Sequence, residues 1–357
     1  MRAANTLLGS ILLCATTVAA NAQEPPPLIA PFGAEILVSE VLLDVLVTDR
    51  KGNAILGLQP SDFLVSEGDR PVEVTAAEFY SHRALEGSTA PVAPAARFLL
   101  FFFDDQRGRN ADVPGLLNRQ VGAGRDAREF LAHALTPTDW VAILGYDFKL
   151  RLFADFTRDR EVLARAVEAA TTGKPDRGNW PSRQPVEEGT PSLSRRLPAG
   201  DELRDQTATI YEAITLISEA STSIYGRKNL LLFTAGFGRM NRFRQYEPDP
   251  RYYEPMIESL NDANVAVYAF DLTEPGTRHP FADAMSQISS DTGGRYFADL
   301  SQFEAALTRV AAETSGYYLV SYRATHPSGL RGFQHVKVRL ANPELKLTAR
   351  RGYRFGD

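Results

Sequence analysis

The sequence is nearly free of cysteine: Cys14 is the only one in 357 residues. Cys14 lies in an N-terminal segment, residues 1–22, with the features of a signal peptide: a positive charge at Arg2, a short apolar run and a small-x-small pattern at 20–22. A lipoprotein cysteine is the alternative, but Leu13 stands where such a site needs a small residue. Removal of the segment leaves no thiol, which excludes disulfides and thiolate chemistry. We therefore expect an exported protein, periplasmic or extracellular, whose stability comes from packing.

The chain also lacks an excess of positive charge and, after the N-terminal segment, any long apolar run. Its 39 Lys and Arg residues against 44 Asp and Glu residues give a net charge of -5, which provides no basic surface for nucleic acid. The N-terminal apolar run is too short for a good membrane span, and no later run reaches that length. These absences predict no nucleic-acid partner and no membrane span in the mature chain.

The motifs of common enzyme classes are missing as well. The sequence has no Gly-x-Ser-x-Gly, no phosphate-binding Gly-x-x-x-x-Gly-Lys-Ser/Thr and no dinucleotide fingerprint. The histidines lack the paired spacing of a zinc site. They are His82, His133, His279, His326 and His335. We therefore expect neither an enzyme nor a bound cofactor.

What the sequence does contain is an alternation of short apolar strands with amphipathic helices. The first strand, residues 98–103, is a run of six apolar residues that ends at Asp104 and Asp105. Such a run is typical of a strand buried on both faces, with its carboxyl end at the edge of a parallel sheet, where ligands of α/β folds bind. Further strands are expected at 140–146, 229–234 and 265–270. The order predicts an α/β fold with a mostly parallel sheet and helices on both faces.

Segments with a β pattern stand on either side of this region. A stretch rich in Ala and Pro precedes the α/β region and is typical of a linker. A long aperiodic loop is expected at 171–206. The predicted organisation is a signal peptide at 1–22, an N-terminal β-rich segment at 23–80, a linker at 81–96, an α/β domain at 97–314 and a C-terminal β segment at 315–357. The two flanking β segments are candidates to pair with each other.

Several motifs, in order, resemble a known family. They are VLLDVLVTDRKGNAILGLQPSDFLVSEGDRPVEV, FLLFFFDD, GRKNLLLFTAGF, ANVAVYAFD, TGGRYF, YYLVSYR and LKLTARRGY. Together they cover nearly the whole mature chain and resemble the von Willebrand factor A-related domain proteins of exported bacterial chains, notably of Acidobacteria. The resemblance implies a von Willebrand A-like (Rossmann-like) α/β domain flanked by antiparallel β segments, exported and without established catalytic activity.

The resemblance also implies the place of a metal-ion-dependent adhesion site, built from Asp-x-Ser-x-Ser, a Thr and a third-loop Asp. Asp104 matches the first Asp, but the serine positions hold Gln106 and Gly108. The Thr position falls on Ala208 or Thr209, depending on a one-residue choice of register, and Thr-Asp-Gly appears as Thr-Ala-Gly at 234–236. The site is therefore degenerate.

A divalent cation such as Mg²⁺ would still find oxygen ligands here. The candidates are Asp104, Asp105, Gln106 and Thr209. The alternative, which we favour, is that Asp104 and Asp105 cap the edge of the sheet and accept backbone N–H bonds from the following turn.

The stretch 239–253 is rich in Arg, Tyr and Phe, the residue types enriched at protein interfaces. The candidate partner-binding residues are Arg239, Arg242, Phe243, Arg244, Tyr246 and Tyr252. The alternative is a loop that packs against its own domain.

The leading hypothesis is an exported, non-enzymatic protein that mediates protein–protein interaction or adhesion at the rim of its α/β domain. The rival hypothesis is a hydrolase that uses the carboxylates of Asp104, Asp105 and Asp271. A closed polar cleft that holds these carboxylates would favour the hydrolase, and an open rim would favour binding. A third reading gives the β segments a role in envelope assembly and makes the α/β domain a scaffold.

Overall fold

The structure is a computed structural model that describes residues 36–81, 93–94, 96–109, 114–173, 188–242, 246–277, 280–327 and 330–356. All of these belong to one structural unit, Ile36–Asp357. The expected signal peptide, most of the expected linker, and the candidates Phe243 and Arg244 lie outside the described residues. Within the described residues, no helix combines the length and the apolar character that a membrane crossing requires.

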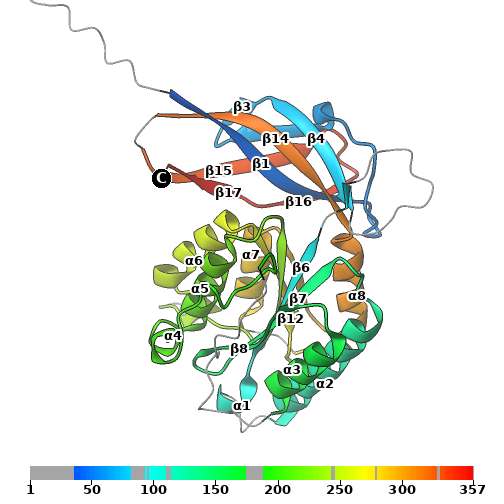
Figure 1. Cartoon of the computed structure of the whole chain (residues 1–357), viewed down its shortest axis with the longest axis vertical. Coiled ribbons are helices and arrows are strands. Elements are labelled where there is room, and N and C mark those ends of the chain that lie inside the picture. The colour runs from blue at the N-terminus through cyan, green and yellow to red at the C-terminus, as the bar shows by residue number, and fades with distance from the viewer. Residues whose placement is uncertain are drawn as a thin grey trace, which may run out of the picture. The chain divides into compact units, whose positions relative to one another are not determined.

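A six-stranded sheet forms the centre of the α/β part of the chain (Figure 1). Its strands are β6 (Arg97–Asp104), β7 (Asp139–Tyr146), β8 (Leu150–Thr157), β9 (Lys228–Thr234), β12 (Val265–Asp271) and β13 (Arg295–Phe297). They lie in the order β13-β12-β9-β6-β7-β8, and every neighbouring pair is parallel except β7 and β8. Counted along the chain, this is the order 3-2-1-4-5-6 of a doubly wound fold, with its switch point between β6 and β9. The predicted α/β fold with a mostly parallel sheet is confirmed.

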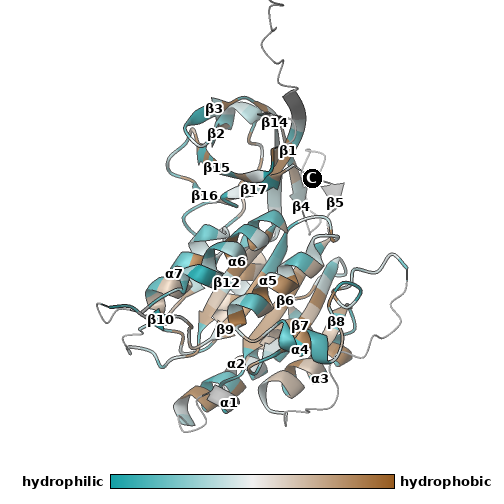
Figure 2. Ribbon diagram, turned by 90° about the vertical axis from the view of Figure 1, so that its left-hand side faces the viewer, coloured by the Kyte–Doolittle hydropathy of each residue, from teal (hydrophilic) through white to brown (hydrophobic). Residues whose placement is uncertain are grey.

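Helices cover both faces of the sheet (Figure 1). One face carries α2 (Pro114–His133), α3 (Arg160–Thr171) and α8 (Glu304–Glu313), and the other carries α5 (Ile210–Ser221), α6 (Pro250–Asp262) and α7 (Ala282–Asp291). Two short helices are α1 (Gln106–Arg109) and α4 (Asp201–Asp205). Figure 2 shows hydrophobic colours along the central strands and hydrophilic stretches on the helices around them.

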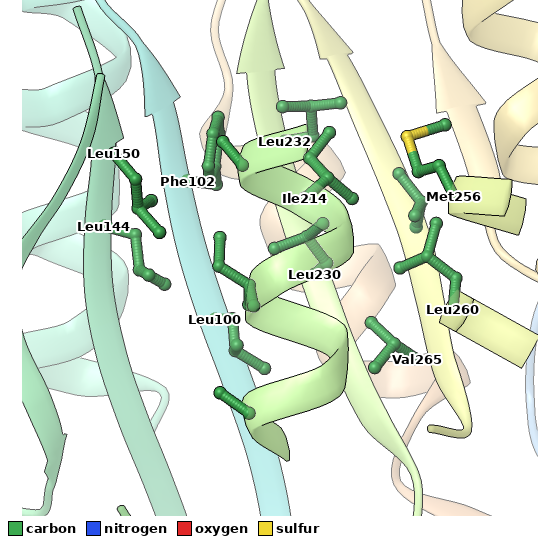
Figure 3. Close-up of a cluster of buried hydrophobic side chains, with 14 of the residues drawn as sticks. Leu100, Phe102, Leu144, Leu150, Ile214, Leu230, Leu232, Met256, Leu260 and Val265 are labelled. Atoms are coloured by element: carbon green, nitrogen blue, oxygen red, sulfur yellow. The ribbon is translucent and has the colours of Figure 1, made fainter. Parts of the chain in front are cut away.

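The apolar strand β6 supplies both layers of the core, because successive side chains of a strand point to opposite faces of the sheet. Leu100 and Phe102 pack with Ile214 of α5 on one face (Figure 3). Phe101 and Phe103 belong to the cluster on the other face, beneath α2, α3 and α8. All eight residues of β6 are buried, so the prediction of a strand buried on both faces is confirmed.

Apart from a two-stranded pair, β10 (Arg239–Met240) with β11 (Tyr246–Glu247), the remaining strands of the described residues form two further sheets, which we call the β body. Its strands are β1 (Ile36–Thr48), β2 (Phe63–Glu67), β3 (Arg70–Val72), β4 (Val74–Ser81), β5 (Ala93–Pro94), β14 (Gly316–Pro327), β15 (Gly332–Leu340), β16 (Lys346–Ala349) and β17 (Gly352–Phe355), with a 3₁₀ turn, η1 (Pro60–Asp62), before β2. The orders are β16-β1-β14-β4-β5 and β17-β15-β2-β3. β1 pairs with β14 from Ile36 opposite Pro327 to Val45 opposite Tyr318. Strands from both sides of the α/β region therefore share one apolar core.

One carboxylate ties the segment before α4 to the edge strand β8. Asp155 accepts hydrogen bonds from Leu193 N at 2.9 Å, from Ser194 N at 3.1 Å, and from the hydroxyls of Ser192 and Ser194 at 2.6 and 2.7 Å. Leu193 and Leu197 are buried in the core below. The part of the expected 171–206 loop that the structure describes thus contains a fastened segment and the helix α4.

We expect Asp155→Ala to release this segment. Two backbone N–H groups and two hydroxyls lose their acceptor, and leaving such groups unsatisfied costs about 1–3 kcal/mol each when they are buried. Trypsin should then cleave faster after Arg195 and Arg196, which are exposed in the same segment. Asp155→Asn, which keeps one acceptor oxygen, should show an intermediate cleavage rate. Equal rates for the wild type and Asp155→Ala would contradict the fastening role.

Candidate functional site

The carboxyl ends of β6 and β9 meet at the switch point of the sheet. β6 ends at Asp104 and β9 ends at Thr234. The Thr234 hydroxyl donates a hydrogen bond to Asp104 Oδ2 at 2.6 Å, and Gly236 N donates to Thr234 Oγ1 at 2.9 Å. The Asp104 side chain is buried, with 1% of the residue exposed. One oxygen of this carboxylate is therefore bonded across the sheet.

Asp105 binds a different set of groups. Its carboxylate accepts a hydrogen bond from Arg107 N at 3.0 Å and forms an ion pair with the Arg107 guanidinium at 2.6 Å. The side-chain amide of Gln120 in α2 donates to it at 3.1 Å. Asp105 thus accepts a backbone N–H from the turn that follows it and already has a cation as its partner.

The other two candidate metal ligands are engaged as well. Gln106 donates its side-chain N–H to the backbone oxygen of Asp104 at 2.6 Å. Thr209 caps α5: its hydroxyl accepts from Glu212 N at 3.2 Å and donates to Glu212 Oε2 at 3.0 Å. Among the described residues, no group of three or more His, Cys, Asp or Glu side chains is arranged to hold a metal ion. A hard cation binds through several oxygen ligands. Asp105 and Thr209 already use their side-chain oxygens in bonds within the protein, and Asp104 uses at least one of its two, so a cation bound here would compete with these bonds.

Asp271, at the end of β12, is also held by its neighbours. Its carboxylate accepts from Thr273 N at 2.8 Å, from the Thr273 hydroxyl at 2.7 Å and from the Tyr296 hydroxyl at 2.7 Å. Burial and the hydrogen bond to Asp271 raise the pKa of Tyr296. The three carboxylates of the hydrolase hypothesis therefore each have their own protein partners.

A cavity of about 380 Å³, which we call the rim cavity, opens beside these residues at the carboxyl edge of the sheet. It brings together three residues proposed from the sequence, namely Thr209, Arg239 and Tyr252. The wall is dominated by aromatic rings. These are Tyr146, Phe148, Tyr211, Phe237 and Tyr252. None of the three carboxylates discussed above belongs to this wall.

The rings in the wall hold one another in place. Tyr211 meets Phe237 edge to face, with ring centroids 5.0 Å apart, and stacks on Tyr252 at 5.9 Å. Such aromatic pairs contribute about 0.5–1.5 kcal/mol beyond the area that they bury. The wall is therefore formed before any ligand arrives.

Asp249 fixes the basic side of the cavity. It caps α6, and its carboxylate binds the Arg251 guanidinium at 3.0 and 2.6 Å. The bond to Arg251 lowers the pKa of Asp249 to about 2. Arg239 pairs with Glu247 at 3.3 Å and is half exposed. Both arginines line the cavity, and each is held by a carboxylate.

Phe148 is the exposed aromatic residue of the wall. It lies in the turn between β7 and β8, where Asp147 N donates to Lys149 O at 3.1 Å. Its φ angle is 54°, and 53% of the residue is exposed. A bulky residue in the left-handed region is strained, and such strain clusters at functional sites. No pattern used in the sequence analysis points to Phe148, Tyr211 or Phe237 as part of a site, whereas Arg251 stands in the stretch 239–253 but was not among the candidates.

The other partner-binding candidates are not all gathered here. Arg242 is exposed but does not line the rim cavity. Tyr246 pairs through its backbone with Met240, where β11 (Tyr246–Glu247) meets β10 (Arg239–Met240). A groove of about 240 Å³ between α5 and α6 shares Arg251 and Tyr252 with the rim cavity. The two hollows are thus adjacent along one side of the α/β part.

No protein-family model and no curated protein matches the sequence. Among solved structures, the chain is similar to the von Willebrand factor type A protein from Catenulispora acidiphila, at 10% identity and a TM-score of 0.39, over 85% of this chain and 75% of that one. It is also similar to BatB from Bacteroides thetaiotaomicron, at 12% identity and a TM-score of 0.35, over 62% of this chain and 98% of that one. A third is proximal thread matrix protein 1 from the mussel byssus, at 10% identity and a TM-score of 0.39, over 62% of this chain. The match spans 48% of the mussel chain, about half its length. These likenesses concern the fold alone.

Proposed function

We propose that the chain is an exported, non-enzymatic protein that binds a protein partner at the rim cavity. The observation that carries the proposal is Phe148, a strained and half-exposed ring beside a cavity walled by aromatic and Arg side chains. Tyr, Trp and Arg supply most of the binding energy at protein interfaces when they line desolvated pockets. A cavity of this composition suits an apolar or aromatic side chain of the partner.

The contact does not require a bridging metal ion. Asp104 is bonded to Thr234, Asp105 to Arg107, and Thr209 to Glu212. A metal-bridged contact would have to break these bonds, whereas the rim cavity offers a surface that is already formed. We therefore expect binding to be insensitive to chelators.

The test is a displayed library of random peptides selected on the purified protein, with affinities measured by fluorescence polarisation. We expect the selected peptides to bind Phe148→Ala and Tyr252→Ala at least about tenfold more weakly, which corresponds to about 1.4 kcal/mol per variant. Addition of EDTA should leave the affinity unchanged.

The matched control is Tyr225→Ala. Tyr225 is 93% exposed and precedes β9, at the opposite end of the strand from the rim cavity. Its loss should not change the affinity for any selected peptide. Peptides that bind both cavity variants as tightly as the wild type, or that need a divalent cation, would contradict the proposal.

A further inference from the structure

A second cavity, of about 330 Å³, lies where the turn after α7 meets β15 and β16 of the β body; we call it the junction cavity. Three cationic side chains line it, Lys337, Arg350 and Arg351, and no carboxylate belongs to its wall. Small-molecule pockets have volumes of about 300–1,000 Å³, so a small ligand fits this space.

Gly293 allows the two parts of the chain to approach each other at this cavity. Its φ angle is +73°, and a Cβ atom on it would lie 2.8 Å from Ala349 O of β16. The Arg227 guanidinium donates a hydrogen bond to Gly293 O, and Arg227 is itself buried. A further cation therefore stands directly behind the wall.

The positive charges of the wall are only partly matched. Arg351 forms an ion pair with Asp291 and donates to the Ser290 hydroxyl at 2.8 Å. Lys337 is exposed and has no ion pair within the described part of the chain. Of the three cationic side chains in the wall, one therefore has a carboxylate in direct contact.

Arg350 has unused hydrogen-bonding capacity. It donates from Nη1 to Asn261 O at 3.0 Å and from Nη2 to Leu42 O at 2.7 Å. Its Nε–H is buried out of reach of a ligand and has no hydrogen-bond partner among the described residues. A guanidinium has five N–H donors, and the two bonds to carbonyl oxygens leave a second N–H on Nη1 and on Nη2. Asp44 and Asp262 act on Arg350 through their charge without a hydrogen bond to it.

A buried lysine, Lys228, lies within the electrostatic range of Arg350. Burial lowers the pKa of Lys228 to about 7; Asp44 opposes this change and Arg350 adds to it. Lys228 Nζ donates to Ile224 O at 2.8 Å. Asp44 in turn lies within the electrostatic range of three cations, Arg227, Lys228 and Arg350.

We propose that the junction cavity binds an oxyanion, a phosphate or sulfate group. The Arg350 and Arg351 guanidinium groups and the Lys337 ammonium provide donors and charge for a tetrahedral anion. The anion would touch residues of the β body and the turn after α7 at once, so its binding would hold these two parts of the chain together. The site is separate from the rim cavity and does not depend on the function proposed for it.

The test is calorimetric titration of the purified protein with inorganic phosphate and with sulfate, at constant ionic strength set by chloride. We expect one ion of either kind to bind per chain and to raise the melting temperature, because a ligand that binds only the folded state stabilises it. A titration with glycerol 3-phosphate distinguishes a free ion from a phosphate carried by a larger molecule. Equal affinities for glycerol 3-phosphate and for inorganic phosphate would indicate that the natural ligand is a phosphate group on a larger molecule. Binding of the inorganic ions alone would indicate that the natural ligand is a free ion.

The variant is Lys337→Gln, which removes an exposed charge from the wall. We expect its affinity for phosphate to fall at least about tenfold. The matched control is Lys346→Gln, the same charge loss at an exposed lysine of β16 outside the wall, which should leave the affinity unchanged. Arg350→Lys, which keeps the charge but removes the fork of donors, should weaken binding as well. No heat of binding to the wild type at millimolar phosphate, or equal affinities for Lys337→Gln and Lys346→Gln, would overturn the proposal.

Discussion

Asp139→Ala should lower the free energy of unfolding by about 3–5 kcal/mol, because it leaves a buried charge without its partner. Arg97 and Asp139 form two parallel hydrogen bonds, Nε to Oδ1 at 2.8 Å and Nη2 to Oδ2 at 2.6 Å. Both side chains are almost fully buried, at 1% and 0% exposed. After the substitution, the Arg97 guanidinium would keep only weaker neutral acceptors such as Ala311 O at 3.0 Å.

The measurement is urea unfolding followed by circular dichroism. The control is the double variant Arg97→Met/Asp139→Leu, which removes both charges and should recover most of the lost stability, because apolar pairs often replace buried ion pairs at little cost. A loss below about 1 kcal/mol for Asp139→Ala, as is typical of an exposed pair, would contradict the role of this ion pair.

Phe233→Ala should cost about 3–5 kcal/mol, because it opens a cavity at the centre of the sheet. The Phe233 ring is fully buried and stacks on Phe103 and Phe270, with ring centroids 4.8 and 4.6 Å apart. It also meets the ring of Phe303, the N-cap residue of α8, with ring centroids 6.0 Å apart. The substitution therefore removes ring contacts with two neighbouring strands and with a covering helix.

The same unfolding experiment serves for Phe233→Ala, with Tyr225→Ala as its control. Tyr225 is 93% exposed, so its loss should change the free energy of unfolding by no more than about 0.5 kcal/mol. Similar effects of the two variants would mean that the aromatic cluster relaxes around the missing ring.

The fold could be predicted because its central strands are short apolar runs that can be recognised within a few residues of sequence. The apolar run 98–103 shows strand length and burial on both faces, and the same pattern recurs at 229–234 and 265–270. The edge strand β8 gives no such signal, since only Leu150, Ala154 and Phe156 of its eight residues are buried. Its direction, antiparallel to β7, is set by the short turn around Phe148.

The candidate site could be predicted only in part. Asp104 and Thr234 could be placed at the edge of the sheet because they end apolar strands, but their hydrogen bond depends on which strands are neighbours. Arg239 and Tyr252 could be proposed as binding residues from the composition of the sequence, since they stand in a stretch rich in Arg and Tyr. Phe148 and Tyr211 come from distant segments and join this wall only in the folded chain. Composition could not separate them from ordinary core or surface aromatics.

The pairing of β1 with β14 affects the order in which the protein can fold. Leu43 of β1 is paired with Val320 of β14. The sheet of the β body therefore cannot form until the whole α/β region between these strands has been synthesised. Contacts between such distant segments slow folding, and until then the edge of β1 remains open to pairing with other chains. The α/β region, by contrast, builds its sheet from residues that are all present earlier. We therefore expect a slow last phase of refolding in which β1 joins β14, and aggregation of the newly made chain should be greatest before that phase.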